Sequence, residues 1–412
     1  MKSRLVIVGC GPKALAIAAK AGILRQLGYE VPDIVIIERD CVASHWNGSS
    51  GFTDGAQFLG TPAEKDCGFP YSSTLEPQTN ALMLKEYSWP AYLIARQEYG
   101  DRVDRGRPQP THAEWGQYLT WVSEKARPQV QRGELRRIQV QGERWRIMYE
   151  EGTKQHSIDA DGLMITGPGE PKRFEGQPSH HARIFDGRNF WTNIDKFKKL
   201  KREDSVGVLG AGETAAAIVV KLSQILTKDI TIEIIHRHGA VFSRGESFDE
   251  NRWFTDPTDW KTLSEEQRDE LIERTDRGVF SVHSKRIIDQ ARNVNPMVMQ
   301  VSKISFKHGL PLVIGKGGWE RSYEYLVVAN GFDPLWFVKF MDEPLMKLCP
   351  GEDNLRRRIR TDLSVDHISP RIHLPMLAAF EQGPGFPNLS CLGLLADRVL
   401  ETYVRPKKAR RR

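Results

Sequence analysis

The stretch SRLVIVGCGPKAL, residues 3–15, decides the fold of the N-terminal part of the chain. An apolar, β-branched run ends at Gly9, and a glycine-spaced turn leads directly into the alanine-rich residues 14–21, which predict a helix. Gly9 allows the chain to reverse sharply, Gly11 lets backbone N–H groups approach a pyrophosphate, and the small Ala14 lets the helix pack closely on the strand. The helix N-terminus would then face the phosphates of a dinucleotide. The residues predicted to hold this ligand are Gly9, Gly11, Pro12 and Ala14.

A second apolar strand, residues 34–37, ends in Glu38. A carboxylate at this point is placed to accept hydrogen bonds from the hydroxyls of an adenosine ribose. Glu38 follows the glycine turn by more than the usual ~20 residues, which fits a longer helix and loop over residues 22–33. A single glycine turn of this kind also fits a strand–helix connection that binds no ligand.

The same arrangement recurs at residues 205–215, SVGVLGAGETA, and a second strand follows at residues 230–235. Two complete copies predict an α/β protein with two Rossmann-like dinucleotide-binding units. The second copy has Arg237 after its strand in place of a carboxylate, and a guanidinium suits a ribose 2′-phosphate. We therefore expect the first unit to bind FAD and the second to bind NADPH. The residues predicted to hold NADPH are Gly210, Gly212, Glu213, Thr214 and Arg237.

The positive charge of the chain is concentrated at its C-terminal end. The 412 residues carry a formal net charge of +6, and residues 405–412 contain six Lys and Arg side chains, so residues 1–404 are formally neutral. We expect a disordered basic tail over residues 405–412 and a body that binds neither nucleic acid nor a membrane. The sequence also predicts no signal peptide and no transmembrane segment, because its apolar runs are shorter than about 18 residues.

Five cysteines are scattered over the chain without a Cys-x-x-Cys pair. This spacing argues against a zinc site and against the dithiol of the disulfide reductases, which share the double dinucleotide plan. We therefore predict no metal site and a reducing, cytoplasmic location.

Two segments beyond the glycine turns carry aromatic side chains. Residues 44–62 form a polar loop with embedded aromatics, which is typical of the wall around a flavin ring; an ordinary surface loop with Trp46 in the core is the alternative. Residues 110–122 place apolar side chains at spacings of three and four, which predicts an amphipathic helix whose stripe serves packing.

Taken in order, these motifs resemble those of the flavin-dependent N-hydroxylating monooxygenases, the family of lysine and ornithine N-monooxygenases of siderophore biosynthesis. The resemblance extends from about Arg4 to Arg398. The features that carry it are the Gly9-Cys10-Gly11-Pro12 turn, Trp46 with Gln57, the helix with Glu114, Trp115, Tyr118 and Trp121, the turn at residues 210–215, Ser247 to Asn251 with Phe254, and residues 327–334 with Asn330 and Gly331.

The resemblance implies a chain in which the NADPH unit is inserted into the FAD unit. Residues 1–170 and 326–404 would form the FAD-binding domain, with a returning strand at Leu326, and residues 171–325 the NADPH-binding domain with a helical insertion on the substrate side. It also implies that NADPH reduces FAD, that O₂ adds to give a C4a-hydroperoxyflavin, and that a primary amine, an amino acid or polyamine-like compound, is N-hydroxylated. The implied partners are the amine and O₂, and relatives suggest a homo-oligomer.

By the same resemblance, Gln57 and Asn251 are the catalytic residues. Trp46 and Gln57 would lie beside the flavin ring and the nicotinamide, and Asn251 would contact the substrate and NADP⁺. Asn330 and Gly331 are assigned to cofactor binding. The alternative to a catalytic role is that Gln57 and Asn251 are ordinary amide side chains on the protein surface.

The expected clamp for the carboxylate of the substrate differs from that of the family. The family lysine corresponds to Pro62 or, with a shift, to Lys65, which we assign to substrate binding, and Val279 stands where a second asparagine is expected. These differences predict that free lysine or ornithine is not hydroxylated in the usual pose.

Two other functions remain open from the sequence. Phe174-Glu175-Gly176, followed by His180 or His181 and Phe185, is close to the fingerprint of the wider class B flavin monooxygenases, which oxygenate carbon or sulfur in Baeyer–Villiger or sulfide oxidation. The other alternative is a flavin-containing binding or sensor protein that uses the basic tail.

Overall fold

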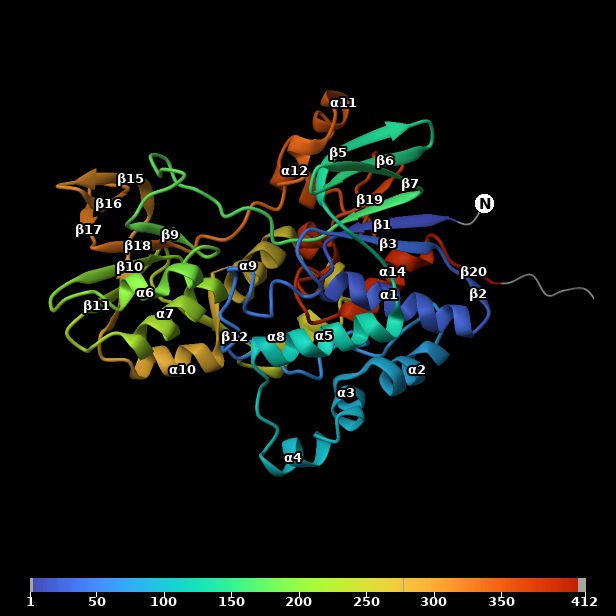
Figure 1. Ribbon diagram of the computed structural model, residues 1–412, viewed down its shortest axis with the longest axis horizontal. Helices are drawn as coiled ribbons and strands as arrows, with labels where there is room; N and C mark the ends of the chain where they lie inside the picture. The colour runs from blue at the N-terminus through green and yellow to red at the C-terminus, as the bar shows by residue number, and fades with distance from the viewer. Residues whose placement is uncertain (1–2, 277, 407–412) are drawn as a thin grey trace, which may run out of the picture.

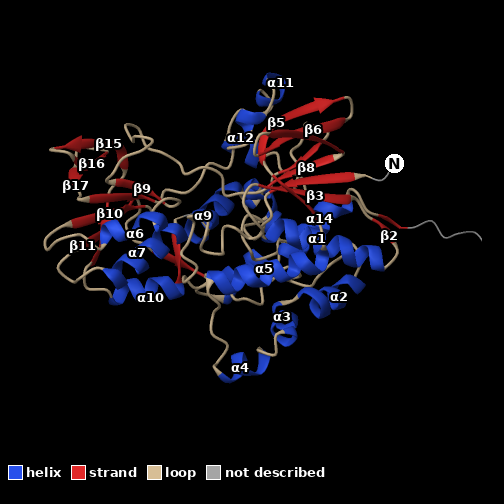
Figure 2. Ribbon diagram, viewed as in Figure 1, coloured by secondary structure: helices blue, strands red, loops and turns tan. Residues whose placement is uncertain are grey.

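The computed structural model describes residues 3–276 and 278–406 and contains two five-stranded parallel sheets (Figure 1). The two sheets lie on opposite sides of the molecule, with helices and loops between them (Figure 2). The predicted α/β fold with two Rossmann-like units is confirmed.

The first sheet has the strand order β19–β8–β1–β3–β4. At its centre β1 (Arg4–Val8) pairs in parallel with β3 (Asp33–Glu38), from Leu5 opposite Ile34 to Val8 opposite Ile37. The apolar run is buried because α1 (Pro12–Gln26) covers it and packs in turn on α14 (Leu392–Glu401) and α5 (His112–Ala126). The remaining strands are β8 (Gly162–Ile165), β4 (Gln129–Arg132) and β19 (Arg371–His373).

The second sheet repeats this plan with the order β14–β11–β10–β18–β9. Its central strand β10 (Ser205–Leu209) pairs in parallel with β11 (Thr231–His236), from Val206 opposite Ile232 to Leu209 opposite Ile235. Helix α7 (Glu213–Ile225) follows β10 as α1 follows β1, and α10 (Val282–Gln290) packs beside it. The outer strands are β14 (Val294–Val298), β18 (Tyr325–Val328) and β9 (Ile184–Asp186).

The strand at Leu326 was expected to return to the first sheet, and this is wrong. β18 pairs with β10 and β9 in the second sheet, with Leu326 opposite Gly207 and Ile184. The first sheet is completed only by β19, which pairs with β8. The insertion of the second unit into the first is nevertheless confirmed, because the chain leaves the first sheet after β8 and returns to it at β19. The expected domain limits at residues 170 and 404 stay predictions.

The C-terminal segment differs in part from the predicted tail. Arg405 and Pro406 form a short strand, β20, antiparallel to β2 (Tyr29–Glu30). The two residues were assigned to the tail from charge alone, which does not register the open backbone edge that β2 offers. Residues 407–412 lie outside the described residues.

The other elements complete the two units. One antiparallel three-stranded sheet consists of β5 (Glu134–Gln141), β6 (Arg144–Glu151) and β7 (Lys154–Ala160). A second consists of β15 (Val301–Lys307), β16 (Leu310–Gly315) and β17 (Glu320–Ser322). In addition, β12 (Phe242–Arg244) pairs with β13 (Val279–Ser281). The smaller helices are α2 (Gln78–Tyr87), α3 (Trp89–Ala95), α4 (Tyr99–Asp104), α6 (Ile194–Phe197), α8 (Phe248–Thr255), α9 (Glu265–Thr275), α11 (Glu343–Met346), α12 (Glu352–Arg356) and α13 (Ala379–Gln382). Over residues 3–276 and 278–406, none of the helices has both the length and the apolar character needed to cross a membrane.

Candidate active site between two nucleotide cradles

A cavity of about 870 Å³ lies where the two units meet. Its wall takes residues from both glycine turns and from the loop over residues 44–62. The predicted site residues that line it are Gly9, Gly11, Pro12, Glu38, Trp46, Gln57, Lys65, Glu213, Thr214 and Asn251. Ala14, Gly210, Gly212, Arg237, Asn330 and Gly331 are not part of this wall.

The first glycine turn has the shape of a nucleotide cradle. Gly9 has φ +100°, and a Cβ there would lie 2.2 Å from Oγ1 of Thr166. In contrast, a Cβ on Gly11 would meet no atom within 4 Å, so the space above this residue is open to a ligand. Gly11 caps α1 and Pro12 begins it, so the free N–H groups of the helix face that space. The turn therefore fits a pyrophosphate, the part of FAD expected here.

Glu38 lies at the end of β3 beside this cradle. Its Oε2 accepts a hydrogen bond from the backbone N of Cys10 at 2.7 Å, and its Oε1 accepts one from the N of Asp40 at 2.9 Å. These two bonds hold the carboxylate at the cavity wall, and each oxygen keeps a lone pair for a ribose hydroxyl. Ala14, which is fully buried, has the packing role expected of the third small residue.

The second glycine turn repeats the first in detail. Gly210 has φ +135°, and a Cβ there would lie 2.3 Å from the carbonyl oxygen of Ala329. Gly212, like Gly11, caps the following helix and has open space where its Cβ would stand. In both units the first glycine touches the end of the neighbouring strand and the second leaves room for phosphate. The second cradle therefore fits the pyrophosphate of NADPH.

Glu213 is the first residue of α7 and the least expected group in a phosphate cradle. Its Oε1 is buried without a hydrogen-bond partner among the described residues. Burial raises the pKa of Glu213, and the nearby Arg244 opposes that rise. The rise in pKa shifts this carboxyl toward its neutral form, which would weaken its repulsion of a phosphate.

The residue after β11 was predicted to be the cation for the 2′-phosphate, yet Arg237 lies away from the cavity wall. Its Nη2 is 3.1 Å from Oε1 of Glu273, and its side chain is 62% exposed. The strand register shows that His236, and not Arg237, occupies the position that Glu38 has in the first unit. Arg244, on β12, does line the cavity. The role of Arg237 stays a prediction.

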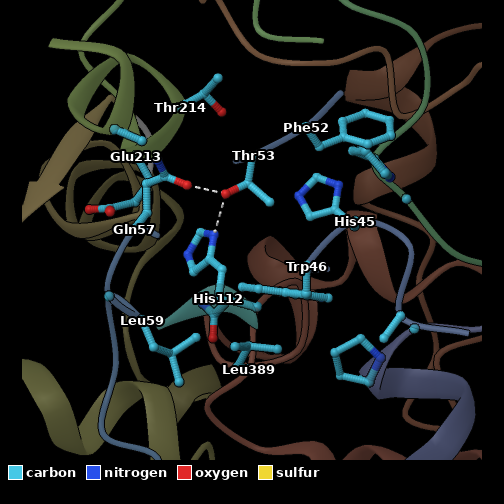
Figure 3. A pocket seen from close by; sticks show the side chains of 18 of the residues that line it. His45, Trp46, Phe52, Thr53, Gln57, Leu59, His112, Glu213, Thr214 and Leu389 are labelled. Carbon is cyan, nitrogen blue, oxygen red and sulfur yellow. Dashed lines mark hydrogen bonds between the residues drawn. The ribbon is translucent and has the colours of Figure 1, made fainter. Parts of the chain in front are cut away.

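The aromatic wall predicted over residues 44–62 is present (Figure 3). The rings of Trp46 and His112 meet edge to face with their centroids 4.9 Å apart, and His45 packs on Phe52 at 4.5 Å. Burial lowers the pKa of His45 and of His112 to about 4 in each case. Both imidazoles are therefore neutral near pH 7. Gln57 lies in the same wall, on the opposite side of Thr53 from His45.

The cavity wall also carries lysine and amide side chains. Asn251 is on α8, where its Nδ2 donates to the carbonyl oxygen of Ser247 at 2.8 Å. The Nζ of Lys13 donates to the carbonyl oxygen of Pro387 at 2.7 Å, and burial lowers the pKa of Lys13 to about 8. Burial also lowers the pKa of Lys65, with a further contribution from Arg244. Lysine and amide side chains of this kind can bind an anionic group.

Three other predicted features lie elsewhere. Gly331 lines a separate cavity of about 160 Å³ with Trp336 and Met376, and Asn330 is exposed beside it. The segment from Phe174 to Gly176 packs on β15, where the N–H of Ile304 donates to the carbonyl oxygen of Glu175 at 2.9 Å. The segment therefore packs against the second unit and does not line the cavity.

Sequence reasoning missed several residues that line the cavity. They are His45, Thr53, His112, Lys13, Lys221 and Arg244. Lys13 directly follows the glycine turn, so its place in the sequence could have drawn attention to it. The other five come from loops, helix faces and the strand β12, which meet only in the folded chain, and no spacing marks them.

Two nucleotide cradles that open on one cavity, with an aromatic wall beside the first, define the class of flavoproteins that pair FAD with a nicotinamide cofactor. Comparison with known proteins narrows this class. The family model for L-lysine 6-monooxygenase/L-ornithine 5-monooxygenase matches residues 79–293. The L-lysine N6-monooxygenase MbtG of Mycobacterium tuberculosis (strain ATCC 25618 / H37Rv) is 40% identical over 419 aligned residues, which cover 97% of this chain and 95% of that protein.

Solved structures agree with this result. The lysine monooxygenase NbtG from Nocardia farcinica superposes with a TM-score of 0.86 at 34% sequence identity, covering 99% of this chain and 100% of that one. The ornithine N-hydroxylase KtzI from Kutzneria sp. 744, solved with reduced FAD, NADP⁺ and L-ornithine, shares the fold with a TM-score of 0.73 at 17% identity, over 98% and 99% of the two chains. The chain belongs to the L-lysine 6-monooxygenase/L-ornithine 5-monooxygenase family. The expected class, a flavin-dependent N-hydroxylating monooxygenase, is confirmed.

Proposed function

We propose that the protein is an NADPH- and O₂-dependent N-hydroxylase that acts on the terminal amine of a lysine-like compound, in siderophore or natural-product biosynthesis. The observation that carries this proposal is the 40% identity to a protein named L-lysine N6-monooxygenase over 97% of the chain. A cytoplasmic location and self-association stay predictions.

The expected cofactors, FAD and NADPH, fit the two cradles. Gly9, Gly11 and Glu38 would hold the pyrophosphate and ribose of FAD, and Gly210 and Gly212 the pyrophosphate of NADPH. When bound, the flavin supplies the oxygen chemistry: it takes reducing equivalents from NADPH and uses O₂ to transfer one oxygen atom to the substrate nitrogen. The ornithine hydroxylase from Kutzneria, solved with FAD and NADP⁺, supports this pair.

The residues of the chain have to keep the substrate amine unprotonated, because only a neutral amine has the lone pair that takes up oxygen. The cavity shifts its own amines in that direction, since burial lowers the pKa of Lys13 and of Lys65. Leu59 and Leu389 present apolar surface to the same cavity, with Leu389 next to Trp46 and Leu59 on the far side of His112 (Figure 3). A substrate amine held there would lose its proton at a lower pH than in water.

The head group of the substrate would lie near Lys65 and Asn251. Both residues line the cavity, and we assign them to substrate binding. Val279 is buried in β13 and does not line the cavity, so it leaves no amide where the family has a second asparagine. The prediction that free lysine or ornithine is a poor substrate rests on this difference.

Oxygen incorporation from ¹⁸O₂ tests the proposal. Purified enzyme with FAD and NADPH is offered lysine, ornithine, cadaverine, an N-acylated lysine, a ketone and a thioether, and the products are weighed by mass spectrometry. We expect one ¹⁸O atom in an N-hydroxylated amine, with the acylated lysine ahead of the free amino acids. Oxygenation of the ketone or thioether without any hydroxylamine would overturn N-hydroxylation in favour of carbon or sulfur chemistry.

A further inference from the structure

A chain of hydrogen bonds surrounds the side chain of Gln57 (Figure 3). The hydroxyl of Thr53 bonds to Oε1 of Gln57, and Nδ1 of His112 lies 3.2 Å from the same hydroxyl. On the other side, Nε2 of Gln57 donates to Oδ1 of Asp54. Oγ1 of Thr53 also accepts from the N–H of Gly55 at 3.0 Å. The amide is thus held at both ends.

The chemistry of the partners allows only one orientation of this amide. An ionised carboxylate only accepts, so the end of Gln57 that faces Asp54 has to be the NH₂ group. Oε1 then faces Thr53, whose hydroxyl has to donate to it and can only accept from His112. His112 therefore carries its proton on Nδ1.

The ionisation states agree with this assignment. Burial raises the pKa of Asp54, but hydrogen bonds from Lys221, from the N–H of Ala56 and from Gln57 lower it more, so the net pKa lies below its usual value. His112 stays neutral because burial lowers its pKa to about 4. Asp54 is thus an acceptor and His112 a neutral donor over the physiological range.

The chain of bonds also joins the two units. Oδ2 of Asp54 is 2.8 Å from Nζ of Lys221, which lies on α7 behind the second cradle. Thr53 and Gln57 belong to the loop of the first unit, and His112 is the first residue of α5. The amide of Gln57 is therefore fixed by groups from three separate segments, while Gln57 itself lines the cavity.

We propose that Thr53, Asp54 and His112 are positioning residues that hold the Gln57 amide in a single orientation, with its second N–H free to donate to flavin or substrate in the cavity. This inference rests on the proposed function, in which Gln57 acts at the meeting point of flavin, nicotinamide and amine. Without the hydroxyl of Thr53, Oε1 loses the donor that distinguishes it from the NH₂ group, and the amide can turn over.

Thr53→Val tests the inference, because valine keeps the shape of threonine and removes the hydroxyl. We expect about a tenfold lower kcat for hydroxylation, an unchanged KM for NADPH, and more H₂O₂ released per NADPH oxidised. Thr53→Ser keeps the hydroxyl and should retain activity near that of the wild type. Thr120→Val is the matched control, since Thr120 is exposed on the outer side of α5 and its hydroxyl bonds only to the carbonyl oxygen of Gly116 among the described residues.

A second measurement needs no turnover. In flavin-free protein labelled with ¹⁵N in its glutamine side chains, one amide proton of Gln57 should exchange slowly with water, and Thr53→Val should speed that exchange by about tenfold. His112→Leu should act like Thr53→Val, whereas His112→Asn, which can place an N–H near the position of Nδ1, should restore slow exchange.

The inference is wrong if Thr53→Val matches the wild type in both measurements, or if Thr53→Ser is impaired as strongly as Thr53→Val. Failure of the proposed function looks different: the wild type itself then forms no hydroxylamine, while the exchange measurement still reports whether the amide is held.

Discussion

At the scale of single residues, the two glycines of each turn have opposite surroundings. A Cβ on Gly9 or Gly210 would collide with the protein, whereas Gly11 and Gly212 face open space. The first kind of glycine is required by the fold, and the second kind is required only by a ligand. A substitution at Gly11 should therefore change cofactor binding without changing the stability of the fold.

Gly11→Val should leave the protein folded and weaken FAD binding by on the order of a hundredfold, because the new methyl groups would occupy the pyrophosphate position. Gly239→Val is the matched control, since Gly239 also has no atom within 4 Å of its Cβ position but lies outside the cavity wall. Flavin retained after dialysis and quenching of flavin fluorescence measure the effect. Equal FAD affinity in the two variants would show that Gly11 does not form the cradle.

At the scale of elements, α1 and α14 are joined by a buried ion pair. Nζ of Lys20 lies 2.7 Å from Oδ1 of Asp397, and the two side chains are 2% and 4% exposed. Burial lowers the pKa of Lys20, and Asp397 opposes that change. A pair of this kind contributes little net stability compared with apolar side chains of the same size, but losing one partner leaves a buried charge.

Lys20→Met should therefore lower the free energy of unfolding by about 3–5 kcal/mol, and Lys20→Met with Asp397→Leu should recover most of the loss. Lys347→Met is the control: Lys347 pairs with Glu343 on α11, but the two side chains are 73% and 78% exposed. This variant should change stability by less than about 0.5 kcal/mol. Urea unfolding of flavin-free protein, followed by tryptophan fluorescence, gives the three values, and a Lys20→Met protein as stable as the control contradicts the prediction.

The elements also show what the sequence could predict. Both glycine turns and the strands and helices beside them follow from local spacing, so β1, α1, β10 and α7 were all predicted. The error at Leu326 has a physical cause: a short buried strand such as β18 is apolar in either parallel sheet, and its residues do not specify which neighbour it pairs with. His236 and Arg237 were confused because one residue of register decides which side chain ends the strand.

The site was less predictable than the fold. The glycine turns carry their chemistry within a few residues, and Gln57 and Lys65 were reached through family resemblance. The bonds that fix Gln57 join residues 53–57 to His112 and Lys221, which are distant in sequence and have no periodic pattern. Such contacts depend on tertiary packing, and they cannot be predicted from the spacing of residues in a single sequence.

At the scale of the whole molecule, three neutral histidines lie inside the fold. Burial lowers the pKa of His45, His112 and His373 to about 4, from the ordinary value of 6.5. His373 is held between the carbonyl oxygen of Asp362 and the hydroxyl of Tyr403, both at 2.8 Å. The unfolded chain therefore binds more protons than the folded one between pH 4 and 6.5.

The stability that these histidines contribute is complete above pH 6.5 and is lost as the pH falls toward 4, by about 1.4 kcal/mol per pH unit for each ring. His373→Gln should reduce the slope of the unfolding free energy against pH by the contribution of one histidine. His180→Gln, at an exposed side chain, is the control and should leave it unchanged. Unfolding measured at several pH values checks this, and equal slopes for the two variants contradict it.

The late position of β19 has a consequence for how the protein is made. Every strand of the second sheet has been synthesised once residue 328 is added, whereas the first sheet lacks an edge strand until Arg371–His373 follow. The second unit can thus fold on the nascent chain before the last strand of the first unit has been synthesised. Translation that stops between these points would release a protein with β8 uncovered, which is a ready template for aggregation and for quality-control proteases.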